Sequence, residues 1–176
     1  SKSITGHQGL IRNLKKLEKW QDCVEKTQEA LKKLDDPDTI TQEARVQFFT
    51  EAANIKSRYL DDLDGAILDF HKAIETWPQN FELHEQFQNF LEDHQEYLTL
   101  VKVLREGLVV FSELDHSIRL RIKLATILKE NLNDLEESTE ILDSLIRDHV
   151  DHPLVWNLLE NNYRALKKWH PLIRLY

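Results

Sequence analysis

A pattern of large and small apolar residues recurs in this chain after 34 residues, and this recurrence constrains the fold more than any other feature. The first set consists of Leu63, Ala66, Phe70 and Ala73. Its counterparts 34 residues later are Tyr97, Leu100, Leu104 and Gly107. Each set has the three- and four-residue spacing of one helix face. A period of roughly 20 to 50 residues is typical of arrays of stacked supersecondary units. The sequence therefore predicts a helical-repeat array.

The composition agrees with an all-α fold. The 176 residues include four Gly and four Pro, which is too little Gly for a turn-rich β-sandwich or a glycine-looped nucleotide fold. Breaks in the helical pattern are few. They lie at 35–38, 77–80, 112–117, 131–134 and 151–153. After the first break, Thr39 is a candidate N-cap because Gln42 follows three residues later.

Two stretches carry a resemblance to a known family. Trp156-x2-Leu159-Glu160-x2-Tyr163 has the spacing of a first repeat helix, and the segment 64–78, DGAILDFHKAIETWP, has that of a second. Together with the 34-residue period they resemble the tetratricopeptide repeat (TPR), a helix–turn–helix unit. The resemblance implies an all-α solenoid of about five units in one array over 1–176. The approximate units are 4–37, 40–78, 79–112, 115–150 and 153–176. The turn glycine of the family is absent, so the pattern also fits the related half-a-TPR arrays of RNA-processing scaffolds.

Charge is concentrated in the middle of the chain. Residues 61–100 carry ten acidic side chains against one basic side chain, Lys72, in a protein whose formal net charge is −8. This strip would repel a phosphate backbone, so we expect no direct nucleic-acid binding. It is either a solvated helical face or a surface that meets a basic protein partner. No apolar run reaches the roughly 18 residues of a membrane span, and we expect no membrane contact.

The ends and the single cysteine give further expectations. Cys23 cannot form an internal disulfide, which favours the cytoplasm over an oxidising compartment. The chain has no Met and begins Ser-Lys-Ser, so we interpret it as a piece of a longer protein. At the other end Trp169, Leu172, Ile173 and Tyr176 are either exposed, or Trp169 folds back onto Trp156 and Tyr163 of its own unit and leaves only modest exposure. Such an apolar end would accept a further helix or support self-association.

No residue pattern indicates catalysis, a metal or a cofactor. His149 and His152 lack a third ligand, and His84-Glu85 lacks the second histidine of a zinc-protease motif because Gln88 stands there. The segment 61–65 does not fit a calcium loop. Cys23 occupies a place where a TPR has a small packed residue. We therefore expect a protein that is not an enzyme.

The resemblance implies that first helices line a concave groove. We align Ala52/Ala53, Phe87/Gln88, Leu124/Ala125 and Leu159/Glu160 with the packing pair of the family. The polar candidates for partner binding then are Thr50, Asn54, Glu85, Asn89, Glu92, Arg119, Lys123, Asn157, Asn161 and Arg164. Thr50, Asn54, Gln86, Arg119 and Lys123 also match, incompletely, the positions with which some TPR domains clamp a terminal carboxylate.

Two functional hypotheses follow. The first is a non-catalytic protein–protein interaction scaffold that binds a peptide or a helical partner through the groove or through the ends of the array. The second is a structural or regulatory module of a larger enzyme or RNA-processing assembly, packed mainly through its ends.

Overall fold

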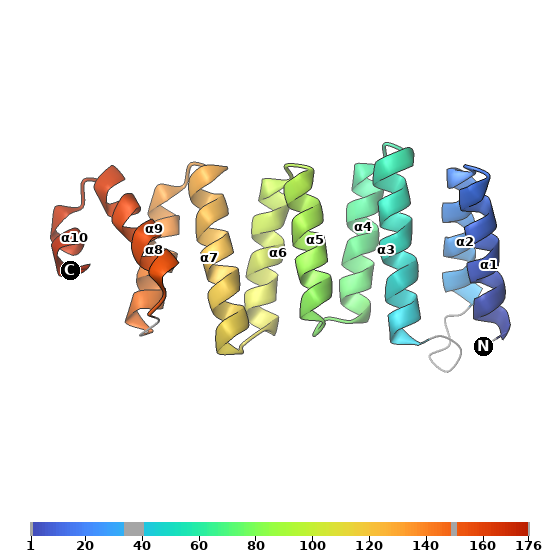
Figure 1. The fold of residues 1–176 in the computed structure, drawn as a ribbon, viewed down its shortest axis with the longest axis horizontal. Coiled ribbons are helices and arrows are strands. Elements are labelled where there is room, and N and C mark those ends of the chain that lie inside the picture. Colours follow the sequence, from blue (N-terminus) through green and yellow to red (C-terminus); the bar gives the residue numbers. More distant parts are fainter. Residues whose placement is uncertain (1, 34–40, 149–150, 176) are drawn as a thin grey trace. The chain divides into compact units, whose positions relative to one another are not determined.

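The computed structural model describes residues 2–33, 41–148 and 151–175. Within these ranges the chain forms ten α-helices and no strand (Figure 1). They are α1 (Lys2–Lys16), α2 (Trp20–Lys33), α3 (Gln42–Tyr59), α4 (Leu63–Thr76), α5 (Phe81–Asp93), α6 (Tyr97–Val110), α7 (Leu114–Glu130), α8 (Leu135–Arg147), α9 (Pro153–Ala165) and α10 (Trp169–Leu175). The fold is all-α, with successive helices packed in antiparallel pairs. The chain divides into two compact units, Ser1–Leu83 (unit 1) and His84–Tyr176 (unit 2).

The core of unit 1 joins α1, α2 and α3. Its buried members are Ile11, Cys23, Val24, Ala30, Phe48 and Ile55. At the edge of this core the Trp20 ring stacks on the Tyr59 ring, with centroids 3.8 Å apart and planes 6° from parallel. Stacked aromatic contact of this kind buries apolar ring area. The predicted packing role of Cys23 is confirmed, since its side chain is completely buried.

In unit 2 a core cluster joins α7, α8, α9 and α10. It consists of Ala125, Leu142, Leu145, Val155, Leu159, Tyr163 and Leu172. The small residue of the 34-residue pattern lies close to its neighbours in α6: a Cβ added to Gly107 would make ordinary van der Waals contact, 3.4 Å from the Leu120 side chain and 3.9 Å from His84. A small side chain here lets α6 approach its neighbours closely.

Every turn inside a helix pair contains one non-glycine residue with a left-handed backbone. These residues are Glu18, Asp61, Gln95, Asn133 and Lys167, with φ between 53° and 61°. Each stands two positions before the second helix of its pair. At Gln95 the turn is a Schellman motif, because the Glu96 N–H donates to Leu91 O and the Gln95 N–H to Glu92 O. The backbone therefore keeps a turn usually made by glycine, although glycine is absent.

Side-chain caps fix several helix starts. Thr41, and not the predicted Thr39, caps α3 by accepting from the Ala44 N–H; Thr39 and the break at 35–38 lie outside the described residues. Asp62 caps α4 by accepting from the Gly65 N–H at 2.9 Å, so the acidic segment 61–65 serves a helix start. Asp134 does the same for α8. These carboxylates also stabilise the positive end of the helix dipole.

The expectation for the C-terminal end is correct only in part. Trp169 and Ile173 are 55% and 71% exposed, as predicted. Leu172 is 7% exposed and belongs to the core cluster with Tyr163, because α10 turns this side chain toward α9. Tyr176 lies outside the described residues.

Candidate partner-binding site

The first helix of each pair places polar side chains beside a buried packing pair, as the alignment with the TPR family predicts. Both residues of the pairs in α3, α5 and α7 are buried, as is Leu159 of α9. Glu160, the last member of the frame, is half-buried. The predicted groove residues next to these pairs face away from the core and are half-buried or exposed. Their positions fit a wet, polar surface.

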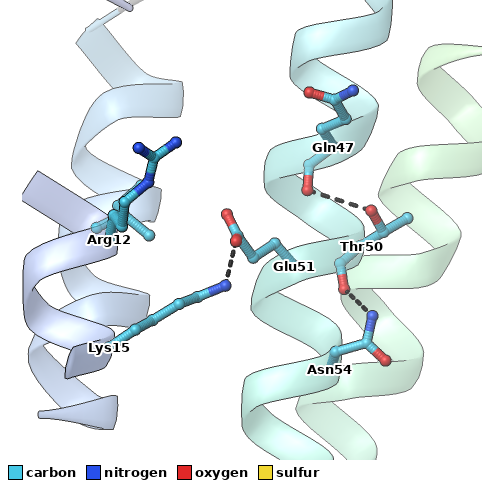
Figure 2. A pocket seen from close by; sticks show the side chains of 7 residues that line it. Arg12, Lys15, Gln47, Thr50, Glu51 and Asn54 are labelled. Carbon is cyan, nitrogen blue, oxygen red and sulfur yellow. Dashed lines mark hydrogen bonds and ion pairs between the residues drawn. The ribbon is translucent and has the colours of Figure 1, made fainter. Parts of the chain in front are cut away.

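In unit 1 this surface contains a cavity of about 510 Å³ between α1 and α3, which we name the α1–α3 cavity (Figure 2). Its lining residues are Ile11, Arg12, Lys15, Gln47, Thr50, Glu51 and Asn54. Buried Ile11 supplies an apolar side chain, and the others are polar or charged. The volume of the cavity lies in the range of ligand pockets, about 300–1,000 Å³, and its mostly polar lining suits a ligand with polar groups.

Some of the polar side chains that line this cavity pair with other groups of the protein, and one charged side chain does not pair with any described residue. The Lys15 ammonium forms an ion pair with Glu51 across the cavity, as Figure 2 shows. Thr50 donates to Val46 O at 3.0 Å, and Asn54 Nδ2 donates to Thr50 O at 2.8 Å, both on their own helix. Arg12 makes no ion pair or side-chain hydrogen bond with any residue that the structure describes. The cavity therefore presents a guanidinium that no described residue compensates.

Sequence reasoning predicted Thr50 and Asn54 but missed the other five residues of this cavity, which are Ile11, Arg12, Lys15, Gln47 and Glu51. A signal was present for Glu51, because it stands 34 residues before the predicted Glu85. The residues of α1 carry no comparable signal. The first pair does not match the repeat pattern closely, and the frame began only at α3.

In unit 2 the structure brings five predicted residues together on α5 and α7. Arg119 Nη2 donates to Glu85 Oε1, and the two residues are 34 positions apart. Lys123 Nζ lies 3.0 Å from Glu92 Oε2 and donates to Asn89 Oδ1 at 3.2 Å. These five side chains pair with one another, so the charges of this α5–α7 cluster compensate each other. The two carboxylates through which we expected a basic partner to bind are thus held by internal cations.

The three predicted residues of α9 stand apart from this cluster. Asn157 and Asn161 are exposed, and Arg164 donates to Glu160 of its own helix at 2.7 Å. The carboxylate-clamp alternative also loses support, since Arg119 and Lys123 already bind acidic and amide groups.

Other chemistry finds little basis in the described part of the chain. No group of three or more His, Cys, Asp or Glu side chains there could hold a metal ion. His152 caps α9, its Nδ1 accepting from the Leu154 N–H at 3.2 Å, and His149 lies outside the described residues. Burial raises the pKa of the Cys23 thiol, which disfavours the reactive thiolate. Over the ranges that the structure covers, no helix is both long and apolar enough for a membrane span.

No protein-family model matches this sequence, and no curated protein matches it significantly. Solved structures do resemble the fold. A kinesin-light-chain-type protein of Podosopora anserina with nearly identical TPR-like repeats is 14% identical at a TM-score of 0.54, over 98% of this chain and 90% of that one. For PilF of Pseudomonas aeruginosa the values are 13%, 0.53, 99% and 74%. For MamA of Desulfovibrio magneticus RS-1 they are 10%, 0.52, 99% and 92%. The predicted TPR-like fold is confirmed.

Proposed function

We propose that this chain is a non-catalytic interaction scaffold that binds an extended peptide of a partner protein in the α1–α3 cavity. The observation that carries the proposal is the open cavity of about 510 Å³ with the uncompensated Arg12 at its side. TPR-like folds expose first-helix surfaces that suit peptides, and a few anchors supply most of the binding free energy in such sites.

The chemistry of the cavity selects what a peptide must offer. Arg12 is a fork of five N–H donors and favours a carboxylate or a pair of carbonyl oxygens. Gln47 and Asn54 are exposed amides that can pair with an extended backbone. Ile11 supplies the apolar contact. Of the ten groove residues, Thr50 and Asn54 line this cavity; binding through the α5–α7 surface or through α9 stays a prediction.

A peptide selection tests the proposal. The full chain is used as bait for a phage-displayed library of random peptides, in parallel with an Arg12→Gln/Asn54→Ala variant and an Asn157→Ala/Asn161→Ala control on α9. We expect one class of selected peptides to disappear with the first variant and to persist with the control. A representative synthetic peptide should lose about tenfold or more in affinity with Arg12→Gln, because a hydrogen bond to a charged group is lost. The same selected class from all three proteins would contradict the proposal.

A second candidate function is supported by the C-terminal end. Trp169 and Ile173 expose large apolar side chains on the short helix α10. A module of a larger assembly that packs through its end would cover them, as would a second copy. Sedimentation over a wide concentration range tests self-association with Trp169→Glu/Ile173→Glu, beside the exposed control Leu98→Glu on α6. Concentration-dependent association that the first variant alone abolishes is expected; a monomer throughout would remove the self-association.

A further inference from the structure

Helix α3 faces a second cavity on its side opposite the α1–α3 cavity. Arg45, Phe49 and Ala52 follow one another at four and three residues and form one stripe of α3. At 100° per residue this stripe points about 180° away from Gln47 and Asn54. The cavity has a volume of about 430 Å³, and α2 and α4 supply its other walls. We name it the α2–α4 cavity.

Each of three helices contributes one cation to this cavity. Lys32 comes from α2, Arg45 from α3 and Lys72 from α4. Lys32 is exposed and makes no ion pair or side-chain hydrogen bond with any residue of the described ranges. Asp69 is the acidic residue among those that line the cavity. Arg45 already has an interaction partner. Whether the cavity attracts anions therefore depends on Lys32 and Lys72 and on how far the Asp69 carboxylate is already neutralised.

A buried lysine already neutralises Asp69. Lys56 Nζ lies 2.7 Å from Asp69 Oδ2 and also donates to Gly65 O at 3.2 Å, and both charged side chains are less than a tenth exposed. Lys72 Nζ is 3.8 Å from Asp69 Oδ1 and 44% exposed. That distance exceeds the roughly 2.7–2.9 Å of a charge-assisted hydrogen bond. Lys72 is thus in excess of what Asp69 requires, and its ammonium can turn to a ligand without leaving a buried charge unpaired.

An apolar wall lies beside these cations. Leu31 and Phe49 are half-buried and Ala52 is buried, while Gln28 adds an exposed amide. A small inorganic anion would contact the cations but leave this wall exposed to water. A segment that carries a carboxylate next to a large apolar side chain would satisfy both parts, since apolar burial adds to the charge interactions.

From this geometry we infer a second docking surface, independent of the proposed groove: the α2–α4 cavity binds a segment of a partner protein in which Asp or Glu stands beside a large apolar residue. Lys32 and Lys72 receive the carboxylate. Leu31 and Phe49 receive the apolar side chain. One helix, α3, would then present opposite faces to two different peptide segments.

The same peptide selection tests this surface with a different variant. Lys32→Gln/Lys72→Gln removes two cations but keeps the Lys56–Asp69 pair, so the fold is retained; thermal unfolding verifies this. Lys168→Gln, an exposed lysine in unit 2, is the matched control. We expect wild type to select a class with an acidic residue beside Leu, Ile or Phe. The class should vanish with the double variant and persist with Lys168→Gln and with Arg12→Gln/Asn54→Ala. A synthetic member should lose at least tenfold in affinity when its acid is replaced by the amide.

Three results would overturn the inference: absence of an acidic–apolar class, its persistence with Lys32→Gln/Lys72→Gln, or binding of inorganic phosphate alone as tightly as the synthetic peptide. The last would show a simple anion site. Failure of the groove proposal is distinguishable, because it concerns a class that depends on Arg12 and Asn54 rather than on Lys32 and Lys72.

Discussion

Units 1 and 2 place their ion pairs differently. Unit 1 holds one pair in its interior, Lys56–Asp69. In unit 2 the corresponding buried polar contact is neutral: Asn162 Nδ2 donates to Ser138 Oγ at 3.0 Å. Ion pairs of unit 2 lie at its surface, for example Arg119–Glu85 between first helices and Arg105–Glu137 between second helices.

This difference in the placement of ion pairs predicts which side chains affect folding stability and which affect binding. A buried pair costs desolvation and is strongly destabilising to break, whereas an exposed pair contributes little. In unit 2 the α7 cations Arg119 and Lys123 are compensated by side chains of α5. In unit 1 no described residue compensates Arg12 or Lys32, which lie beside the two cavities. The comparison therefore predicts large folding effects in the interior of unit 1 and binding effects at its surface.

The largest expected effect comes from breaking the interior pair. Asp69→Ala leaves the Lys56 ammonium buried with Gly65 O as its remaining partner. We expect the free energy of unfolding to fall by about 3–5 kcal/mol, the usual cost of an uncompensated buried charge. Urea denaturation of the full chain, followed by circular dichroism, measures it.

A replacement and a counterpart in unit 2 serve as controls. Lys56→Met/Asp69→Leu removes both charges and should recover most of the loss, because apolar side chains of similar volume avoid the desolvation cost. Asn162→Ala in unit 2 removes a neutral hydrogen bond and should cost about 1–3 kcal/mol. Equal losses for Asp69→Ala and Asn162→Ala would mean that the two interiors do not differ as described.

The left-handed turns give an intermediate effect of opposite sign. Gln95 holds φ 60° in the α5–α6 turn, where a side chain costs roughly 1–2 kcal/mol. Gln95→Gly removes this strain but adds conformational entropy to the unfolded chain. We expect a net gain of up to about 1 kcal/mol in unfolding free energy, measured by the same denaturation.

Glu18→Gly in unit 1 should behave alike, because Glu18 has the corresponding position and a φ of 54°. Asn133→Gly should gain less, since Asn tolerates this backbone region well. A loss of stability at both Glu18 and Gln95 would show that these turns are not strained.

The fold was predictable because its signals are local and periodic. Apolar spacing indicated helices, and the recurrence from Phe70 to Leu104 indicated the repeat. The cap of α3 was misplaced because Thr39 and Thr41 are both acceptable caps and only the backbone conformation, extended at Thr41, decides between them. Leu172 was expected outside because the sequence does not show that α10 turns it onto Tyr163.

The site was predictable only in part because cavities form between helices that are distant in sequence. Glu85 and Arg119 could be chosen as polar positions on first helices, but their mutual pairing depends on the spacing of α5 and α7. The α2–α4 cavity gave no signal, since Lys32, Arg45 and Lys72 belong to three different helices and follow no common period.

The smallest expected effect concerns the exposed Glu85–Arg119 pair of unit 2. It tests whether the charges of the α5–α7 cluster compensate each other and leave no binding surface for a partner. A double-mutant cycle with Glu85→Gln, Arg119→Gln and both together should give a coupling of about 0.2–1 kcal/mol in 0.15 M salt, as for other exposed pairs. The coupling should shrink in 1 M salt, where the screening length falls to about 3 Å. Peptide selection by unit 1 should be unchanged in all three variants. If Glu85→Gln instead abolished a class of basic peptides, the acidic strip would be a binding surface in spite of its internal cations. The ion pair with Arg119 would then be a contact that the partner displaces. Both units would in that case bind partners through charged side chains.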